Sequence, residues 1–160
     1  MPEPGSQLQQ PPRAHTLIAF DFGLKRIGVA VGDTLTARAA PRPAILMLSR
    51  GPDWSAIERE VRAHAPALLI VGVPYNADGT AGALAGAARG FGAALHERLG
   101  LPVAHVDERG SSLEANAALS GNRASGARRR RVRRGDVDSA AAAVILERWL
   151  AGEREGNVSP

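Results

Sequence analysis

The sequence predicts a mixed α/β fold in which a five-stranded sheet carries helices on both faces. Apolar residues 16–22 and 26–32 are separated by only a short polar turn, which is typical of a β-hairpin. Further along, apolar runs alternate with helical patterns, as in strand–helix crossovers. Three antiparallel strands followed by crossovers give a mixed sheet.

The remaining elements follow in chain order. Residues 41–48 are the expected third strand, and residues 52–65 are expected to form a helix with Trp54 and Ile57 on one face. Residues 67–73 are continuously apolar, which is typical of a strand buried on both faces. The later expected elements are a helix over 78–100 with Thr80 as its N-cap, a strand over 101–106, a short helix over 111–120 and a last helix over 135–152.

Glycines recur at four-residue spacing in the helix expected over 78–100, at Gly82, Gly86 and Gly90. Each glycine costs a helix about 1 kcal/mol relative to alanine. We therefore expect this face to pack closely on a neighbouring element.

The ends of the chain are predicted to be disordered tails, residues 1–15 and 152–160, around a single domain over residues 16–151. The absence of cysteine excludes disulfides and thiolate metal sites. No signal peptide is visible, and no run approaches the roughly 20 apolar residues of a membrane span. We expect a soluble, cytoplasmic protein with no membrane partner.

The basic residues are almost all arginine. Lys25 is the single lysine among 20 Lys and Arg residues, and the net charge is +4. Arginine stays charged and binds phosphate with two donors, so a nucleic-acid partner is a reasonable expectation. A compositional drift from lysine to arginine explains the same numbers equally well.

Three carboxylates fall at places where they could meet. Asp21 lies near the end of the first strand, Glu108 just past the fifth, and Asp138 in the first turn of the last helix. A buried carboxylate is costly unless it is paired or binds a metal ion, and three from separate elements suit Mg²⁺ or Mn²⁺. Alternatives are open for each residue: a strand-ending turn, an ion pair with Arg109, and the helix dipole. Asp136 is the expected N-cap of the last helix.

Several residues are candidates for contact with nucleic acid. The arginine-rich segment before Asp138 predicts a phosphate clamp, and its alternative is a solvated charge run. The turn residues Lys25 and Arg26 could reach phosphates, and Asn76 either contacts substrate or builds a turn. The candidate set is Lys25, Arg26, Asn76, Arg109, Arg128, Arg129, Arg130, Arg131, Arg133 and Arg134.

Four separated segments within residues 16–150 stand out: AFDFGLKRIGVAVGD, IVGVPYNADGT, VDERGSS and DVDSAAAAVILERWL. Taken together, they resemble the YqgF/RuvX family of candidate pre-16S ribosomal RNA nucleases and Holliday-junction-resolvase-like proteins. The resemblance implies a ribonuclease H-like fold and a metal-dependent nuclease acting in 5′-end maturation of pre-16S rRNA in the ribosomal particle. Its acidic residues fall on Asp21, Glu108 and Asp138, with Mg²⁺ or Mn²⁺ as the cofactor.

Other functions are open at this stage. The same chemistry could act on four-way DNA junctions, for which a homodimer is expected rather than a monomer. The segment DFGLKRIGVAVGD, residues 21–33, also resembles the first phosphate-binding hairpin of actin-like ATPases and sugar kinases. A non-catalytic ribosome-assembly factor could bind rRNA through the arginine-rich segment alone.

Overall fold

The computed structural model describes residues 15–74, 82–107 and 134–154, and within them a six-stranded sheet in the order β4-β3-β2-β1-β5-β6. The strands are β1 (Thr16–Asp21), β2 (Arg26–Asp33), β3 (Ala39–Leu48), β4 (Gly51–Pro52), β5 (Leu68–Val73) and β6 (Val103–Asp107). Strands β1 to β4 pair antiparallel, whereas β5 and β6 continue the sheet in parallel with β1. The mixed sheet is as predicted. The expected number of strands was wrong by one, because the two-residue β4 is too short to leave a hydrophobic pattern.

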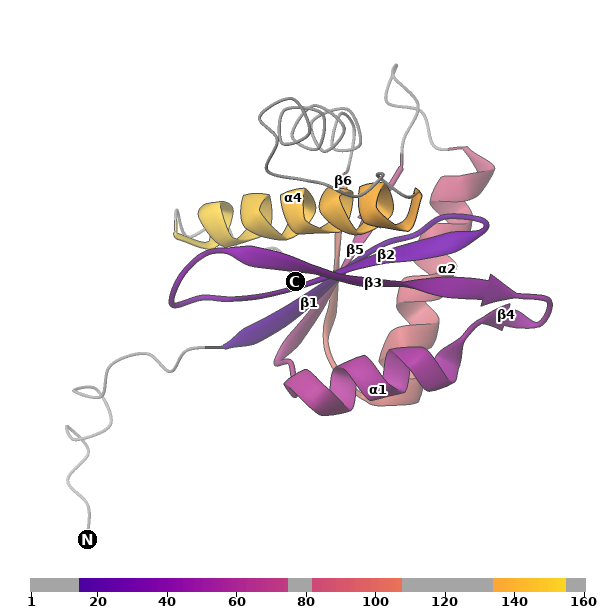
Figure 1. Ribbon diagram of the computed structural model, residues 1–160, viewed down its shortest axis with the longest axis horizontal. Coiled ribbons are helices and arrows are strands. Elements are labelled where there is room, and N and C mark those ends of the chain that lie inside the picture. Colours follow the sequence, from indigo (N-terminus) through magenta and orange to yellow (C-terminus); the bar gives the residue numbers. More distant parts are fainter. Residues whose placement is uncertain (1–14, 75–81, 108–133, 155–160) are drawn as a thin grey trace, which may run out of the picture.

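Helices cover both faces of the sheet, as the sequence predicts (Figure 1). The helix α4 (Arg134–Arg154) packs across β1, β2 and β3 on one face. The helices α1 (Trp54–His64) and α2 (Ala83–Leu99) pack on the other. The described part of the chain contains no helix that is long and apolar enough to cross a membrane.

Alternation along the strands divides the apolar residues between two cores. In β1, Ile18 and Phe20 join the core beneath α1 and α2, whereas Leu17 and Ala19 join the core beneath α4. The central strand β5 contributes to both cores, so its continuous apolar run is explained by burial on both faces. By the same alternation, the next residue of β1, Asp21, belongs to the α4 face.

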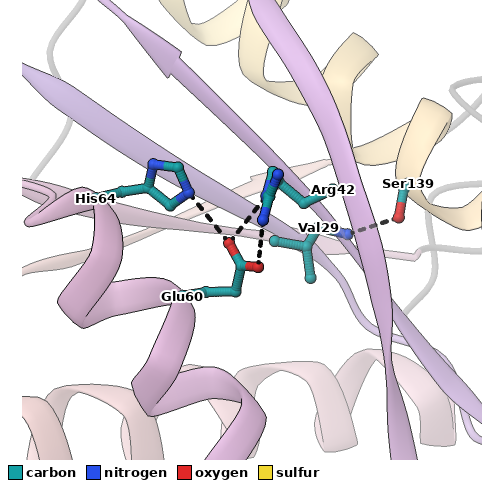
Figure 2. Close-up of polar contacts among 5 residues, drawn as sticks. All are labelled: Val29, Arg42, Glu60, His64 and Ser139. Atoms are coloured by element: carbon teal, nitrogen blue, oxygen red, sulfur yellow. Dashed lines mark hydrogen bonds and ion pairs between the residues drawn. The ribbon is translucent and has the colours of Figure 1, made fainter.

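The exposed edge of the sheet is tied to α1 by a charged cluster (Figure 2). Arg42 of β3 donates from Nε and Nη2 to the two carboxylate oxygens of Glu60, each at 3.1 Å. The hydrogen bonds and charge of Glu60 raise the pKa of Arg42. His64 lies 3.3 Å from the same carboxylate, one helical turn later. This cluster fixes α1 against β3 on the face opposite α4.

The starts of two helices differ from the prediction. Helix α2 begins at Ala83 with Gly82 at its N-cap, so Thr80 is not the cap. Helix α4 begins at Arg134, which places Asp136 inside its first turn rather than at the N-cap. Residues that can cap a helix are common in loops as well as at helix starts. The sequence therefore predicts the first residue of a helix only to within a few positions. The short helix expected over 111–120 lies outside the described residues.

The glycine face of α2 does not pack as expected. Gly86 and Gly90 are exposed, and a Cβ added to either would meet no described atom within 4 Å. The close approach occurs instead at Gly92, where a Cβ would collide with the imidazole of His105. Partial desolvation together with the charge of Arg89 lowers the pKa of His105.

The closest approach between a helix and the sheet occurs at Gly28 of β2. A Cβ on Gly28 would collide with the carbonyl oxygen of Asp138 and would lie 2.8 Å from the amide nitrogen of Ser139. Both are backbone atoms of α4, so a rotamer change cannot relieve the clash. Only a residue without a side chain allows α4 to lie this close to β2.

We expect Gly28→Ala to lower the free energy of unfolding by about 3 kcal/mol, since overpacking against rigid backbone costs about 1–3 kcal/mol. Gly86→Ala is the matched control and should raise it by up to about 1 kcal/mol through helix propensity. Urea denaturation of both variants measures the difference. A Gly28→Ala variant as stable as the wild type would contradict the packing described for α4.

Candidate active site

Asp21 ends β1 on the face covered by α4. The residue is 9% exposed, so Asp21 lies at the margin of the core rather than in solvent. Its register neighbours on the two flanking strands are Gly28 of β2 and Gly72 of β5. Because neither neighbour has a side chain, the carboxylate is not crowded by its own row of the sheet.

Asp138 enters the same region from α4. Its backbone lies directly over Gly28, which is the residue paired with Asp21. Paired Cα atoms of antiparallel strands lie about 4.5–5.5 Å apart. Two of the three predicted carboxylate residues, from elements more than a hundred residues apart in the chain, therefore lie beside the same glycine on one face of the sheet.

Arg26 forms an ion pair with Asp138. Its Nε donates to Oδ2 at 3.1 Å, and the two side chains are 27% and 31% exposed. Arg26 begins β2 and shares a face with Gly28, two residues further on. A partly exposed pair of this kind contributes about 1 kcal/mol or less to stability. The ion pair matters more for the site than for stability, because Arg26 places a positive charge beside Asp138, a candidate metal ligand.

Ser139 fixes the rotation of α4 about its axis. This residue was not among those predicted from the sequence. Its Oγ accepts a hydrogen bond of 3.1 Å from the backbone N–H of Val29, and its side chain is buried (Figure 2). The β2–β3 register shifts between Ile27 and Val29, where Pro43 and Ala44 both stand opposite Gly28. This β-bulge interrupts regular pairing, and Ser139 satisfies the N–H at that point. The sequence does contain a sign of this role, because Ser139 stands among the apolar residues of one face of the last helix.

The other predicted contact residues fall into two groups. Lys25 is exposed in the β1–β2 turn, and its backbone carbonyl accepts from the N–H of Met47 at 3.0 Å. Arg134 is the first residue of α4. The predicted residues outside the described ranges are Asn76, Glu108, Arg109, Arg128, Arg129, Arg130, Arg131 and Arg133.

The donors at this site suit a hard divalent cation. Asp21 and Asp138 offer carboxylate oxygens, the ligands that Mg²⁺ and Mn²⁺ prefer. Within residues 15–74, 82–107 and 134–154, no group of three His, Cys, Asp or Glu residues forms a complete metal site. The third predicted ligand, Glu108, directly follows Asp107, the last residue of β6. The described residues therefore supply two donors of the right kind.

Two hollows in the described surface lie away from these carboxylates. One, of about 460 Å³, lies at the opposite end of β2 and is lined in part by Thr16, Asp33 and His64. The backbone N–H of Thr36 lowers the pKa of Asp33 there. The other, of about 250 Å³, lies between β3 and α1. Neither is lined by Asp21 or Asp138, so the chemistry of the donors identifies the candidate site.

We expect Ser139→Ala to lower the free energy of unfolding by about 1–3 kcal/mol, because it leaves the buried N–H of Val29 without its partner. Ser55→Ala, at an exposed position of α1, is the control and should change stability by less than about 0.5 kcal/mol. Thermal and urea unfolding both report this difference. Equal stabilities of the two variants would show that Ser139 does not hold α4 in place.

Comparison with known proteins identifies relatives of nearly the same length. A chain from Klebsiella pneumoniae strain 342 is 44% identical over 138 residues, and one from Cronobacter sakazakii is 46% identical over 138. Each alignment covers 84% of this chain and 95% of the relative. Both relatives carry pre-16S rRNA nuclease as a provisional name.

Solved structures agree on the fold. Thermus thermophilus RuvC in complex with a Holliday junction substrate superimposes with a TM-score of 0.54 at 16% identity. The match covers 91% of this chain and 99% of RuvC, and a second structure of T. thermophilus RuvC gives a TM-score of 0.52. These matches support the ribonuclease H-like fold that the sequence resemblance implied.

Residues 15–152 match the model of the RuvX family, which is described as Holliday junction resolvase. This range includes β1 and all but the last two residues of α4, with Asp21 and Asp138. The chain therefore belongs to the RuvX Holliday junction resolvase family and is a nuclease.

Proposed function

We propose that this nuclease is a metal-dependent endonuclease that matures the 5′ end of pre-16S rRNA during ribosome biogenesis in the cytoplasm. The observation that carries the proposal is that Asp21 pairs with Gly28 in the sheet while the backbone of Asp138 lies over the same glycine. The naming of relatives at 44–46% identity supports RNA as the substrate.

In this proposal Asp21, Asp138 and Glu108 hold Mg²⁺ or Mn²⁺. Such an ion supplies positive charge that stabilises the phosphodiester transition state. The near-complete burial of Asp21 limits competition from bulk water for its oxygens. The bond between Ser139 and Val29 holds Asp138 at a fixed height over the sheet.

In this proposal, basic residues bind the substrate backbone. Lys25 extends from the exposed turn, and the arginines at 128–131, 133 and 134 lead to the start of α4. Such contacts bind phosphates without reading sequence, and their strength falls as salt rises. The substrate is accordingly recognised by structure and position more than by base sequence.

Four-way DNA junctions are the second candidate substrate, and the description of the matching family favours them. A junction has two symmetry-related strands to cut, so a homodimer suits junction resolution whereas a monomer suffices for rRNA. Sedimentation of the protein with and without each substrate separates these cases.

We expect purified protein with Mg²⁺ or Mn²⁺ to cut a labelled 16S rRNA precursor, and Asp21→Asn to lower the cutting rate by at least about a hundredfold. Removing one charge from the ligand set weakens the metal site. Asp33→Asn is the control, because Asp33 lies at the opposite end of β2 and asparagine preserves the oxygen that accepts from Thr36. A four-way DNA junction assayed in parallel identifies the preferred substrate.

Loss of cutting in Asp21→Asn together with full activity in Asp33→Asn would support this function. Cutting that persists in EDTA, or that Asp21→Asn leaves unchanged, would contradict it. Tight binding of rRNA without any cutting would favour a non-catalytic assembly factor.

The Arg26–Asp138 pair predicts an effect on metal binding that requires no substrate. Arg26→Gln removes a positive charge 3.1 Å from Asp138 Oδ2, so we expect Mn²⁺ affinity to rise about three- to tenfold. Isothermal titration calorimetry with Mn²⁺, without nucleic acid, measures this affinity. Arg38→Gln, which alters an exposed arginine of the β2–β3 loop, should leave the affinity unchanged. Equal affinities for the wild type and Arg26→Gln would show that this pair does not oppose metal binding.

A further inference from the structure

Three exposed leucines lie at the same end of the sheet as the candidate active site. Leu24 of the β1–β2 turn is 73% exposed, and Leu46 and Leu48 of β3 are 57% and 50% exposed. We name these three residues the leucine patch. The turn runs beside the end of β3, because Met47 donates to the carbonyl of Lys25 and Leu46 pairs with Arg26.

Two leucines of the patch share a face of the sheet with Asp138. Along β3, Ile45 and Met47 point into the core beneath α1 and α2, so Leu46 and Leu48 point to the α4 side. Arg26, the register partner of Leu46, reaches Asp138 on that side. The patch therefore adjoins the candidate active site through Arg26.

Helix α4 does not extend over the end of β3. Gly135, in its first turn, lies against Ala44, since a Cβ on Gly135 would be 3.3 Å from that of Ala44. The strand continues for four more residues, to Leu48. On the α4 face of β3, Ala44 thus lies against α4, whereas Leu46 and Leu48 are exposed.

Two basic residues, Lys25 and Arg50, adjoin the patch along the chain. A third, Arg26, is paired with Asp138. Asp21 and Asp53 lie just outside the segments 22–27 and 43–52. Apolar groups beside positive charge match a nucleotide, which presents an apolar base face and a charged phosphate. A stable protein interface buries roughly 800 Å² on each partner, much more than three leucine side chains provide.

We propose that the leucine patch receives an unpaired nucleobase adjacent to the phosphate at the candidate active site. Leucine side chains can insert between bases or contact a displaced base. Lys25 holds the neighbouring phosphate, and a base in a continuous duplex stays stacked out of reach. The inference rests on the proposed function and extends it, because it makes an unpaired nucleotide beside the scissile bond a requirement for tight binding.

The test compares Leu24→Ser/Leu46→Ser with Leu35→Ser. Leu35 is the matched control, because it is 76% exposed but lies in the loop after β2, at the opposite end of that strand. The probes are an RNA hairpin with 2-aminopurine in its loop and a fully paired RNA duplex of equal charge. Binding is measured in EDTA at several salt concentrations, so that neither cutting nor metal affects the result.

We expect the double variant to bind the hairpin about tenfold more weakly and the duplex as the wild type does. The dependence of hairpin affinity on salt should stay the same, because no phosphate contact is removed. Binding to the wild type and to Leu35→Ser should change the 2-aminopurine fluorescence, and binding to the double variant should not.

Equal weakening with both probes, or with Leu35→Ser, would overturn the proposal. So would unchanged hairpin binding in the double variant accompanied by a change in oligomeric state, since the patch would then be a protein interface. A failure of the proposed function appears separately, as absent metal-dependent cutting of the rRNA precursor by the wild type. The EDTA binding assay does not depend on that result.

Discussion

The position of α4 on β2 depends on the missing side chain of Gly28. The backbone of Asp138 and Ser139 occupies the space where a Cβ would stand, and Ser139 then bonds to the neighbouring Val29 N–H. This contact sets the height of the helix over the sheet and its rotation. The positions of Asp138 and of the core residues Ala142, Ile145 and Leu146 follow from it. The same glycine is paired with Asp21, so one packing constraint brings both carboxylates together.

The two carboxylates lie in different surroundings. Asp138 forms an ion pair with Arg26, and Asp21 is buried in a row of the sheet that contains two glycines. In the proposed site, a divalent ion would have to compete with Arg26 for the carboxylate of Asp138. A phosphate group of the proposed substrate would offer Arg26 an alternative partner, so substrate and metal would assist each other's binding.

Much of the sheet could be predicted from sequence, because its signals are local. The hairpin of β1 and β2 and the fully buried β5 follow from the spacing of apolar residues. The glycine spacing in α2 gave a wrong prediction of close helix packing. Gly86 and Gly90 face solvent, whereas the close contacts between elements occur at Gly28 and Gly92. A glycine in sequence does not reveal which distant element approaches it. The Ser139–Val29 bond and the Arg26–Asp138 pair join residues more than a hundred positions apart, and they depend on the docking of α4.

A double-mutant cycle on Mn²⁺ affinity tests most directly whether Asp21 and Asp138 act on one ion. The affinity is measured calorimetrically for the wild type, Asp21→Asn, Asp138→Asn and the double variant, all without nucleic acid. Carboxylates that share an ion should show coupled losses: each single substitution weakens binding, and the double loss differs from the sum of the two. Mn²⁺ affinity that Asp138→Asn leaves unchanged, or losses that simply add, would contradict a shared metal site over Gly28.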